Sequence, residues 1–194
     1  ETDESFNKVK AVGVFVLGLD DSFPPMGFRD KENNIIGFDI DLAKEVCARL
    51  GIELKTQPIS WDAKEQELNT GKIDCIWNGM SVDSARAKAM NLSDPYLKNR
   101  MIFTVKDKAL ANLESLKGKK IAVQNGSTAQ KLLDASEAGK AAKEIVPFDD
   151  NQTALMDLEK GGVDAVFLDE IVAKYWIVTN EKDYTVLEEG LSDE

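Results

Sequence analysis

Histidine is absent from this sequence of 194 residues. Its absence excludes a Ser-His-Asp or Cys-His nucleophile system and any histidine-ligated zinc site, and we expect neither a metal nor a cofactor. Cysteine is nearly absent, with only Cys47 and Cys75. This count leaves open one disulfide, two reduced core thiols, or one of each with an outside partner. We expect a structural role in each case, because no histidine is available to activate a thiolate.

Long apolar runs and an excess of basic residues are missing too. The longest nearly uninterrupted apolar stretch, residues 11–19, is about half of the roughly 20 residues that a membrane helix needs, so no segment is predicted to cross a bilayer. The 24 basic residues are outnumbered by 35 acidic ones, and the net charge is −11. Such a chain does not attract phosphate backbones or anionic lipid, so nucleic acid is not an expected partner.

The composition that remains, 43% hydrophobic and 30% charged, is typical of a soluble globular protein. Short β-rich runs alternate with helical patterns, which predicts an α/β fold with a mostly parallel sheet order. The predicted strands are residues 9–17, 53–57, 73–77, 101–105, 120–124, 144–148, 163–168 and 184–187. The predicted helices are residues 39–50, 62–70, 83–90, 128–136, 151–160 and 169–179. Gly51 is the expected end of the first helix, which has a clear amphipathic stripe.

An internal repeat, offset by 90 residues, relates residues 67–77 to residues 157–167. Each copy is typical of a helix end, a glycine cap and a buried strand. A common α/β connection used twice would explain the pair, but we favour two similar α/β lobes. Pro95 breaks the helical pattern between the copies, so we expect lobe 1 over residues 1–97, a hinge strand over 98–104 and lobe 2 over 105–187. Two lobes joined in this way leave a cleft, where small ligands bind.

Polar clusters follow the predicted strands at three places. In the first cluster Asp20 and Phe23 stand at a strand end, where open α/β sheets bind ligands, although a simple turn is the more frequent use of such residues. In the second, Ser81 offers a hydroxyl and Arg86 offers two N–H groups to a carboxylate. The alternative for this second cluster is a solvated arginine beside an Asp83 N-cap.

The third cluster, residues 124–128, offers backbone N–H groups and two hydroxyls to an anion. The nucleotide-binding Walker pattern is absent from it. Asp169 is either the N-cap of the helix that follows, which the local sequence favours, or the counter-charge to an ammonium. Together with the aromatic rings of Phe23 and Trp61, the clusters supply what an α-amino acid requires: donors for its carboxylate, a carboxylate for its ammonium and a wall for its side chain.

The segment 37–43, the turn at residues 20–25, the series 73–86 and the turn 126–128 together resemble the family 3 extracellular solute-binding proteins. These are the polar amino-acid receptors of ABC importers. The resemblance keeps its order through nearly the whole chain. It implies the type II periplasmic-binding-protein fold, in which two α/β lobes enclose a ligand cleft and close over the ligand by a hinge motion.

The resemblance also implies roles for single residues. The ligand's carboxylate would lie on Arg86, its ammonium on Asp169, and its side chain between Phe23 and Trp61 with Asp20 at the polar tip. An aspartate beside two rings suits a flat or cationic tip, so arginine or lysine is favoured, followed by glutamine and cystine. The expected ligand-binding residues are Asp20, Phe23, Trp61, Asn78, Gly79, Met80, Ser81, Arg86, Gln124, Ser127, Thr128 and Asp169.

The function that the resemblance implies is a non-enzymatic receptor that delivers its ligand to the permease of an ABC importer. It would be periplasmic or extracellular, or lipid-anchored through a segment before Glu1, since the chain begins as a processed or trimmed form would. One alternative is the ligand-binding domain of a sensory receptor. The other is an enzyme resembling the cyclohexadienyl and arogenate dehydratases, with its acid among Asp20, Asp62, Glu65 and Asp169.

The C-terminus departs from the family. Members continue with a return strand and helices that pack on the first lobe, whereas residues 188–194 would only begin this second connection. We therefore expect exposed apolar surface on lobe 1 and a looser hinge. The consequence would be either weaker ligand binding or a dimer in which a second chain supplies the missing element.

Overall fold

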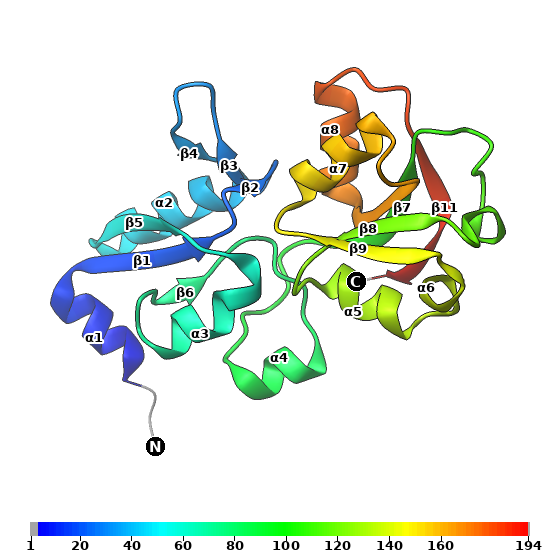
Figure 1. Cartoon of the computed structure of the whole chain (residues 1–194). Coiled ribbons are helices and arrows are strands. Elements are labelled where there is room, and N and C mark those ends of the chain that lie inside the picture. Colours follow the sequence, from blue (N-terminus) through cyan, green and yellow to red (C-terminus); the bar gives the residue numbers. More distant parts are fainter. Residues whose placement is uncertain (1–3, 194) are drawn as a thin grey trace. The chain divides into compact units, whose positions relative to one another are not determined.

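The computed structural model describes residues 4–193, and its chain divides into two compact units between Met80 and Ser81. Each unit is an α/β structure, as expected (Figure 1). The lobe boundaries expected from the sequence, with a hinge strand at residues 98–104, stay a prediction.

The first unit is built on a parallel sheet in the order β5-β1-β6. Its strands are β1 (Val14–Leu19), β5 (Glu53–Pro58) and β6 (Cys75–Ile76), and its helices are α1 (Ser5–Val12), α2 (Phe38–Leu50), η1 (Trp61–Ala63) and α3 (Lys64–Asn69). Helix α2 confirms the predicted amphipathic helix and ends at Gly51 in the left-handed conformation. Its buried residues Ile40 and Ala43 pack against Leu17 and Leu19 of the central strand.

The strand predicted over residues 9–17 is wrong in its first half. Residues 5–12 form α1, and the strand begins only at Val14. Gly13 separates the two elements, because its φ of 76° lets its N–H group donate back to the carbonyl of Val9 as a helix cap. The apolar run therefore spans a helix end and a strand start, which periodicity within one short window does not separate.

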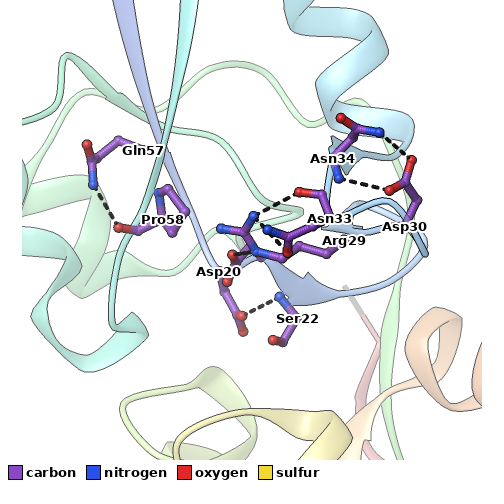
Figure 2. A network of polar contacts seen from close by, with 9 residues as sticks. Asp20, Ser22, Arg29, Asp30, Asn33, Asn34, Gln57 and Pro58 are labelled. Carbon is purple, nitrogen blue, oxygen red and sulfur yellow. Dashed lines mark hydrogen bonds and ion pairs between the residues drawn. The ribbon is translucent and has the colours of Figure 1, made fainter.

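A small antiparallel sheet in the first unit was not predicted. Its strands are β2 (Ser22–Phe23), β3 (Gly27–Arg29) and β4 (Ile35–Ile36), each too short to show alternation. Arg29 braces it by donating to the carboxylate of Asp21 and to the carbonyl oxygen of Asn33, and Figure 2 shows Arg29 beside Asn33. Its first strand, β2, lies within the turn at residues 20–25 that the sequence singled out.

The second unit is built on a mixed sheet in the order β11-β7-β10-β8-β9. Strands β8 (Lys120–Gln124), β9 (Glu144–Phe148) and β10 (Ala165–Asp169) run parallel, while β7 (Arg100–Val105) is antiparallel to both of its neighbours. Helices α7 (Asn151–Lys160) and α8 (Glu170–Thr179) cover one face, and α5 (Thr128–Ala135) and α6 (Glu137–Ala141) cover the other (Figure 1). The remaining elements are α4 (Ser84–Ala89) and η2 (Leu113–Leu116).

The last strand, β11 (Thr185–Asp193), is longer than the predicted strand 184–187. Its pairing with β7 shifts register on either side of Gly190 and then continues to Arg100. A Cβ atom at Gly190 would lie 2.6 Å from the carbonyl oxygen of Met101, so glycine permits this close approach. The prediction therefore matches only the beginning of β11, and the irregularity at Gly190 lies within the strand.

The sequence repeat is also a repeat of hydrogen bonds. Gly71 and Gly161 both adopt left-handed conformations, with φ of 72° and 80°. Three residues later, the carboxylate of Asp74 accepts from the Val16 N–H group at 2.8 Å, and the Asp74 N–H group donates to the Val16 carbonyl at 2.8 Å. Asp164 makes the same two bonds with Lys120, at 2.8 and 2.9 Å. Each copy thus ties a glycine turn to a neighbouring parallel strand, which supports two similar lobes.

Candidate functional site

Arg86 lies in the first turn of α4, and its side chain is almost entirely buried, with 6% of the residue exposed. One of its terminal nitrogens, Nη1, donates to the carbonyl oxygen of Ser81 at 2.8 Å and to the hydroxyl of Thr128 at 2.9 Å. The structure therefore joins three of the predicted ligand residues, which come from two predicted clusters. The alternative of a solvated surface arginine is wrong.

Asp83 holds the helix that carries this arginine. Its Oδ1 caps α4 by accepting from the N–H groups of Ala85 at 2.7 Å and Arg86 at 2.9 Å. Its Oδ2 lies 3.8 Å from Arg86 Nε and 3.4 Å from Lys131 Nζ. Burial raises the pKa of Asp83, but these N–H groups and the two cations outweigh it and hold the pKa below its usual value. The expected N-cap is confirmed, and it also faces the guanidinium.

In the turn at residues 124–128, several hydrogen-bonding groups already have partners within the protein. Ser127 caps α5 by accepting from the Gln130 N–H group at 3.1 Å, and the Gly126 N–H group donates to Gln130 Oε1 at 2.8 Å. The buried amide of Gln124 donates to the carbonyl of Asp149 and accepts from Asn151. Gln130, which the sequence did not single out, thus takes up one of the N–H groups expected to bind an anion.

Asp169 stands at the N-cap position of α8, but its side chain makes no capping hydrogen bond, so the favoured interpretation as a cap is wrong. Its Oδ1 instead accepts from Asn99 Nδ2 at 2.6 Å. Gln124 and Asp169 are the last residues of the parallel neighbours β8 and β10. The turn that follows Gln124 and the carboxylate of Asp169 therefore lie at the same edge of the sheet, where α/β sheets bind their ligands.

In the first unit, a second group of predicted residues surrounds Met26 and Gly27. A Cβ atom placed on Gly79 would lie 3.3 Å from Met26 Cγ and 3.6 Å from the ring of Phe23. One placed on Gly27 would lie 3.5 Å from Asn78 Oδ1 and 3.9 Å from the carbonyl oxygen of Asp20. At Gly27 that Cβ atom would also lie 2.8 Å from Leu19 Cδ1, so glycine permits the close packing there, and at Gly79 glycine permits the φ of 60°.

Asp20 and Asn78 are both buried polar side chains in this group. Asp20 Oδ1 accepts from the Ser22 N–H group at 2.8 Å, which is the turn geometry expected as the ordinary use of such a residue (Figure 2). Asn78 is 2% exposed, and its Oδ1 has no hydrogen-bond partner within the described part of the chain. The group therefore presents acceptor oxygens beside an aromatic ring.

Trp61 and Met80 are the remaining predicted residues. Trp61 is buried at the start of η1, and Lys64 Nζ lies 5.0 Å from its ring centroid while donating to its carbonyl oxygen at 3.0 Å. Lys64 is itself buried, with 5% exposed, so one cation already accompanies this ring. Met80 is half-buried at the end of the first unit. Met80 is flanked in the chain by Gly79 and Ser81, which are themselves predicted site residues.

Both cysteines are free thiols, which excludes the disulfide among the alternatives. Burial, with the negative charge of Asp74 as a smaller cause, raises the pKa of Cys75 to about 11. Within residues 4–193, no group of three or more histidine, cysteine or acidic residues is placed to hold a metal ion. No helix in that range has both the length and the apolar character needed to span a membrane.

Two curated relatives show what kind of protein this chain is similar to. It is 32% identical over 164 residues to ABC transporter arginine-binding protein 1 of Escherichia coli, a match covering 84% of this chain and 66% of the relative. It is 29% identical over 170 residues to the L-cystine-binding protein TcyJ of Escherichia coli, covering 86% of this chain and 63% of the relative. The chain therefore spans slightly less than two thirds of these proteins.

Three solved structures match nearly the whole chain. A substrate-binding protein of a Streptococcus pneumoniae ABC uptake transporter, with histidine bound, has a TM-score of 0.93 and 32% identity, covering all of this chain and 82% of that one. A truncated, arginine-bound arginine-binding protein of T. maritima has a TM-score of 0.86 and 35% identity, covering 97% and 88%. An ancestral amino-acid-binding protein, described as a precursor of cyclohexadienyl dehydratase, has a TM-score of 0.88 and 31% identity, covering 98% and 82%.

The family model of the bacterial extracellular solute-binding proteins, family 3, matches residues 15–176. This range includes every residue of the two groups described above. The resemblance found in the sequence motifs, the fold of both units and the agreement with these relatives lead to one assignment. The chain belongs to the bacterial extracellular solute-binding proteins of family 3.

Proposed function

We propose that this chain is a non-enzymatic receptor that binds a polar L-amino acid and delivers it to the permease of an ABC importer. Support comes from the family and from relatives named for binding arginine and cystine, together with a solved structure that contains histidine. In this proposal Arg86 and Asp169 of the second unit hold the ligand's carboxylate and ammonium. The family's description favours a periplasmic or extracellular location.

The observation that carries the proposal is the buried guanidinium of Arg86. Burying a guanidinium is costly unless a carboxylate pairs with it at hydrogen-bond distance, and the two hydrogen bonds that Arg86 Nη1 donates to described residues go to neutral oxygens, those of Ser81 and Thr128. Asp83 Oδ2 lies 3.8 Å from Arg86 Nε, beyond hydrogen-bond distance, and Asp83 uses its other oxygen to cap the helix. A ligand carboxylate would complete the charge balance through a forked pair of N–H bonds.

Asp169 is the proposed partner of the ligand's ammonium. Its carboxylate lies at the sheet edge that also carries Thr128, and Thr128 is bonded to Arg86. For the side chain, the acceptors Asp20 and Asn78 beside the ring of Phe23 favour a ligand tip rich in donors. Arginine or lysine is therefore the preferred ligand, with glutamine next and cystine third.

A thermal-shift screen of the full chain against the twenty amino acids, ornithine and cystine tests the proposal. We expect a rise in melting temperature for at least one of the preferred ligands, and calorimetry then measures its affinity. Arg86→Ala should weaken binding by about 2–5 kcal/mol, which is at least about 30-fold, because it removes a desolvated charged pair. Arg49→Ala is the matched control, since Arg49 pairs with Glu45 on the exposed face of α2. Undiminished affinity in Arg86→Ala would contradict the assignment.

The dehydratase alternative is supported by the likeness to the ancestral precursor of cyclohexadienyl dehydratase. It would need a protonated acid in the site. The family and the two curated relatives, in contrast, are named for solute binding. We therefore prefer the receptor, and incubation with prephenate or arogenate, followed by product detection, separates the two functions.

A dimer, the alternative to weaker ligand binding, is a further part of the proposal. Light scattering of the full chain, with and without the ligand that the screen identifies, measures its mass. A monomer with affinity equal to that of a version extended at the C-terminus would contradict both the dimer and the expected weaker binding.

A further inference from the structure

Two consecutive residues at the start of β7 bind two consecutive residues at the junction of β10 and α8. Asn99 Nδ2 donates to Asp169 Oδ1 at 2.6 Å. Next to it, Arg100 makes a forked pair with Glu170, in which Nε and Nη2 each donate to one carboxylate oxygen at 2.9 Å. All four residues lie in the second unit. The antiparallel pairing of β7 with β10 brings the two pairs together, with Asp169 opposite Met101.

The two pairs differ in how many of their side-chain polar atoms have hydrogen-bond partners. Glu170 accepts from Arg100 with both oxygens and also pairs with Lys174 at 2.7 Å. Asn99, in contrast, has an Oδ1 atom that is buried and has no hydrogen-bond partner among the residues that the structure describes. A buried carbonyl without a partner opposes folding. Stability therefore explains Arg100 well, but it does not explain an asparagine at position 99.

The chemistry of Asp169 supplies an explanation. Aspartate is among the preferred N-cap residues, yet the Asp169 side chain does not cap α8 and accepts from Asn99 instead. An amide donor orients a carboxylate without cancelling its charge. A lysine or arginine at position 99 would compete with an ammonium for the same carboxylate, and an acid would repel it.

We infer that Asn99 is a positioning residue, which holds the Asp169 carboxylate in the orientation that receives the ligand's α-ammonium. The inference rests on the proposed function, in which Asp169 binds that group. Asn99 acts through Asp169 and need not touch the ligand itself. The unpaired buried Oδ1 of Asn99 lowers stability, and the function of its Nδ2 group, which orients the Asp169 carboxylate, explains why an asparagine stands at this position.

Calorimetry on the full chain tests this with L-arginine and 5-guanidinopentanoate, which is arginine without its α-amino group. Asn99→Leu keeps the approximate shape of the side chain and removes the donor. We expect it to weaken L-arginine binding about 10- to 100-fold, the range for a hydrogen bond to a charged group, and to change binding of the desamino analogue by less than about threefold. L-Glutamine and glutaramate serve as a second pair of the same design. Circular dichroism confirms that each variant is folded.

Arg100→Gln is the matched control. It breaks the neighbouring pair with Glu170 and should lower stability, while the preference for L-arginine over its desamino analogue stays unchanged. A double-mutant cycle with Asp169→Asn gives a second measurement, because Asn99→Leu should then have little additional effect on L-arginine binding.

Equal weakening of the amino acid and its desamino analogue by Asn99→Leu would show a merely structural role and overturn the inference. Additive losses in the cycle, or no loss at all in Asn99→Leu, would overturn it as well. If the unaltered chain binds no amino acid in the screen, the proposed function fails and the inference falls with it. That outcome is distinct, because it appears before any variant is made.

Discussion

Glu170 should contribute to stability in a manner that depends on pH. Its carboxylate accepts from Arg100 at 2.9 Å twice and from Lys174 at 2.7 Å, and it lies in the first turn of α8, where a negative charge is favourable. The hydrogen bonds from Arg100 and then Lys174 lower the pKa of Glu170 from 4.5 to about 2. A difference of that size corresponds to about 3 kcal/mol, at 1.4 kcal/mol per pKa unit. Solvent screens the partners, of which Arg100 is 35% and Lys174 62% exposed, so we expect about 1–2 kcal/mol.

The direction of the pH dependence follows from the lowered pKa. A carboxylate whose pKa is lower in the folded state stabilises the fold above its unfolded pKa of 4.5 and loses that contribution as pH falls towards 2. Glu170→Gln should therefore reduce the free energy of unfolding by about 1–2 kcal/mol at pH 7. The difference between the two proteins should shrink steadily below pH 4.5.

Urea unfolding at pH 7, 5, 4 and 3 measures this difference. Glu137→Gln is the matched control, because hydrogen bonding to Lys140 also lowers the pKa of Glu137, but that pair is fully exposed on the surface. The control should leave the free energy of unfolding nearly unchanged at every pH. A difference for Glu170→Gln that is as large at pH 3 as at pH 7, or that the control reproduces, would refute the reasoning.

The remaining predictions concern a helix cap, the repeat and the thiols. Asp83→Ala should destabilise the protein by about 1 kcal/mol in urea, whereas Asp83→Asn, which keeps a capping oxygen, should cost less than half of that; equal losses would mean that the cap is unimportant. Asp74→Ala and Asp164→Ala should each lower the free energy of unfolding by about 1 kcal/mol, the net contribution of an ordinary hydrogen bond, because each removes the side-chain acceptor of a strand N–H group. A loss of stability in only one of the two variants would contradict the prediction that the hydrogen bond contributes equally in both copies of the repeat. With a thiol reagent at pH 8, Cys75 should react slowly in the native protein because its pKa is about 11, and two thiols should react in urea without a reductant. Detection of fewer than two would contradict the free thiols of the structure.

Elements with strong local signals were predictable from the sequence. Strands 120–124 and 144–148 and helix 151–160 have the predicted bounds. Their limits are set by groups close in the chain, such as the left-handed glycine at the end of the helix and the capping carboxylate of Asp150 at its start. The repeat was visible for the same reason, because a helix end and its glycine lie within a few residues of the strand that follows.

Long-range partners were not predictable from local patterns. The bond between Arg86 and Thr128 joins residues 42 apart, and the bond between Asn99 and Asp169 joins residues 70 apart. The second of these decides that Asp169 does not cap α8, although its position and type favour a cap. Asn99 has no local sequence signal at all, since its role depends entirely on which strand lies beside it.

The sequence by itself determined the chemical inventory: no histidine, a buried-strand pattern in each half, and an arginine, an aspartate and aromatic rings placed next to strand ends. The tertiary structure decided which of these groups meet. Within the second unit, the antiparallel β7 brings Asn99 to Asp169, and the packing of α4 brings Arg86 to Thr128. The physical reason is that hydrogen-bond geometry is set to within tenths of an ångström by strand register and packing, whereas sequence periodicity specifies only the face and the end of an element on which a residue lies.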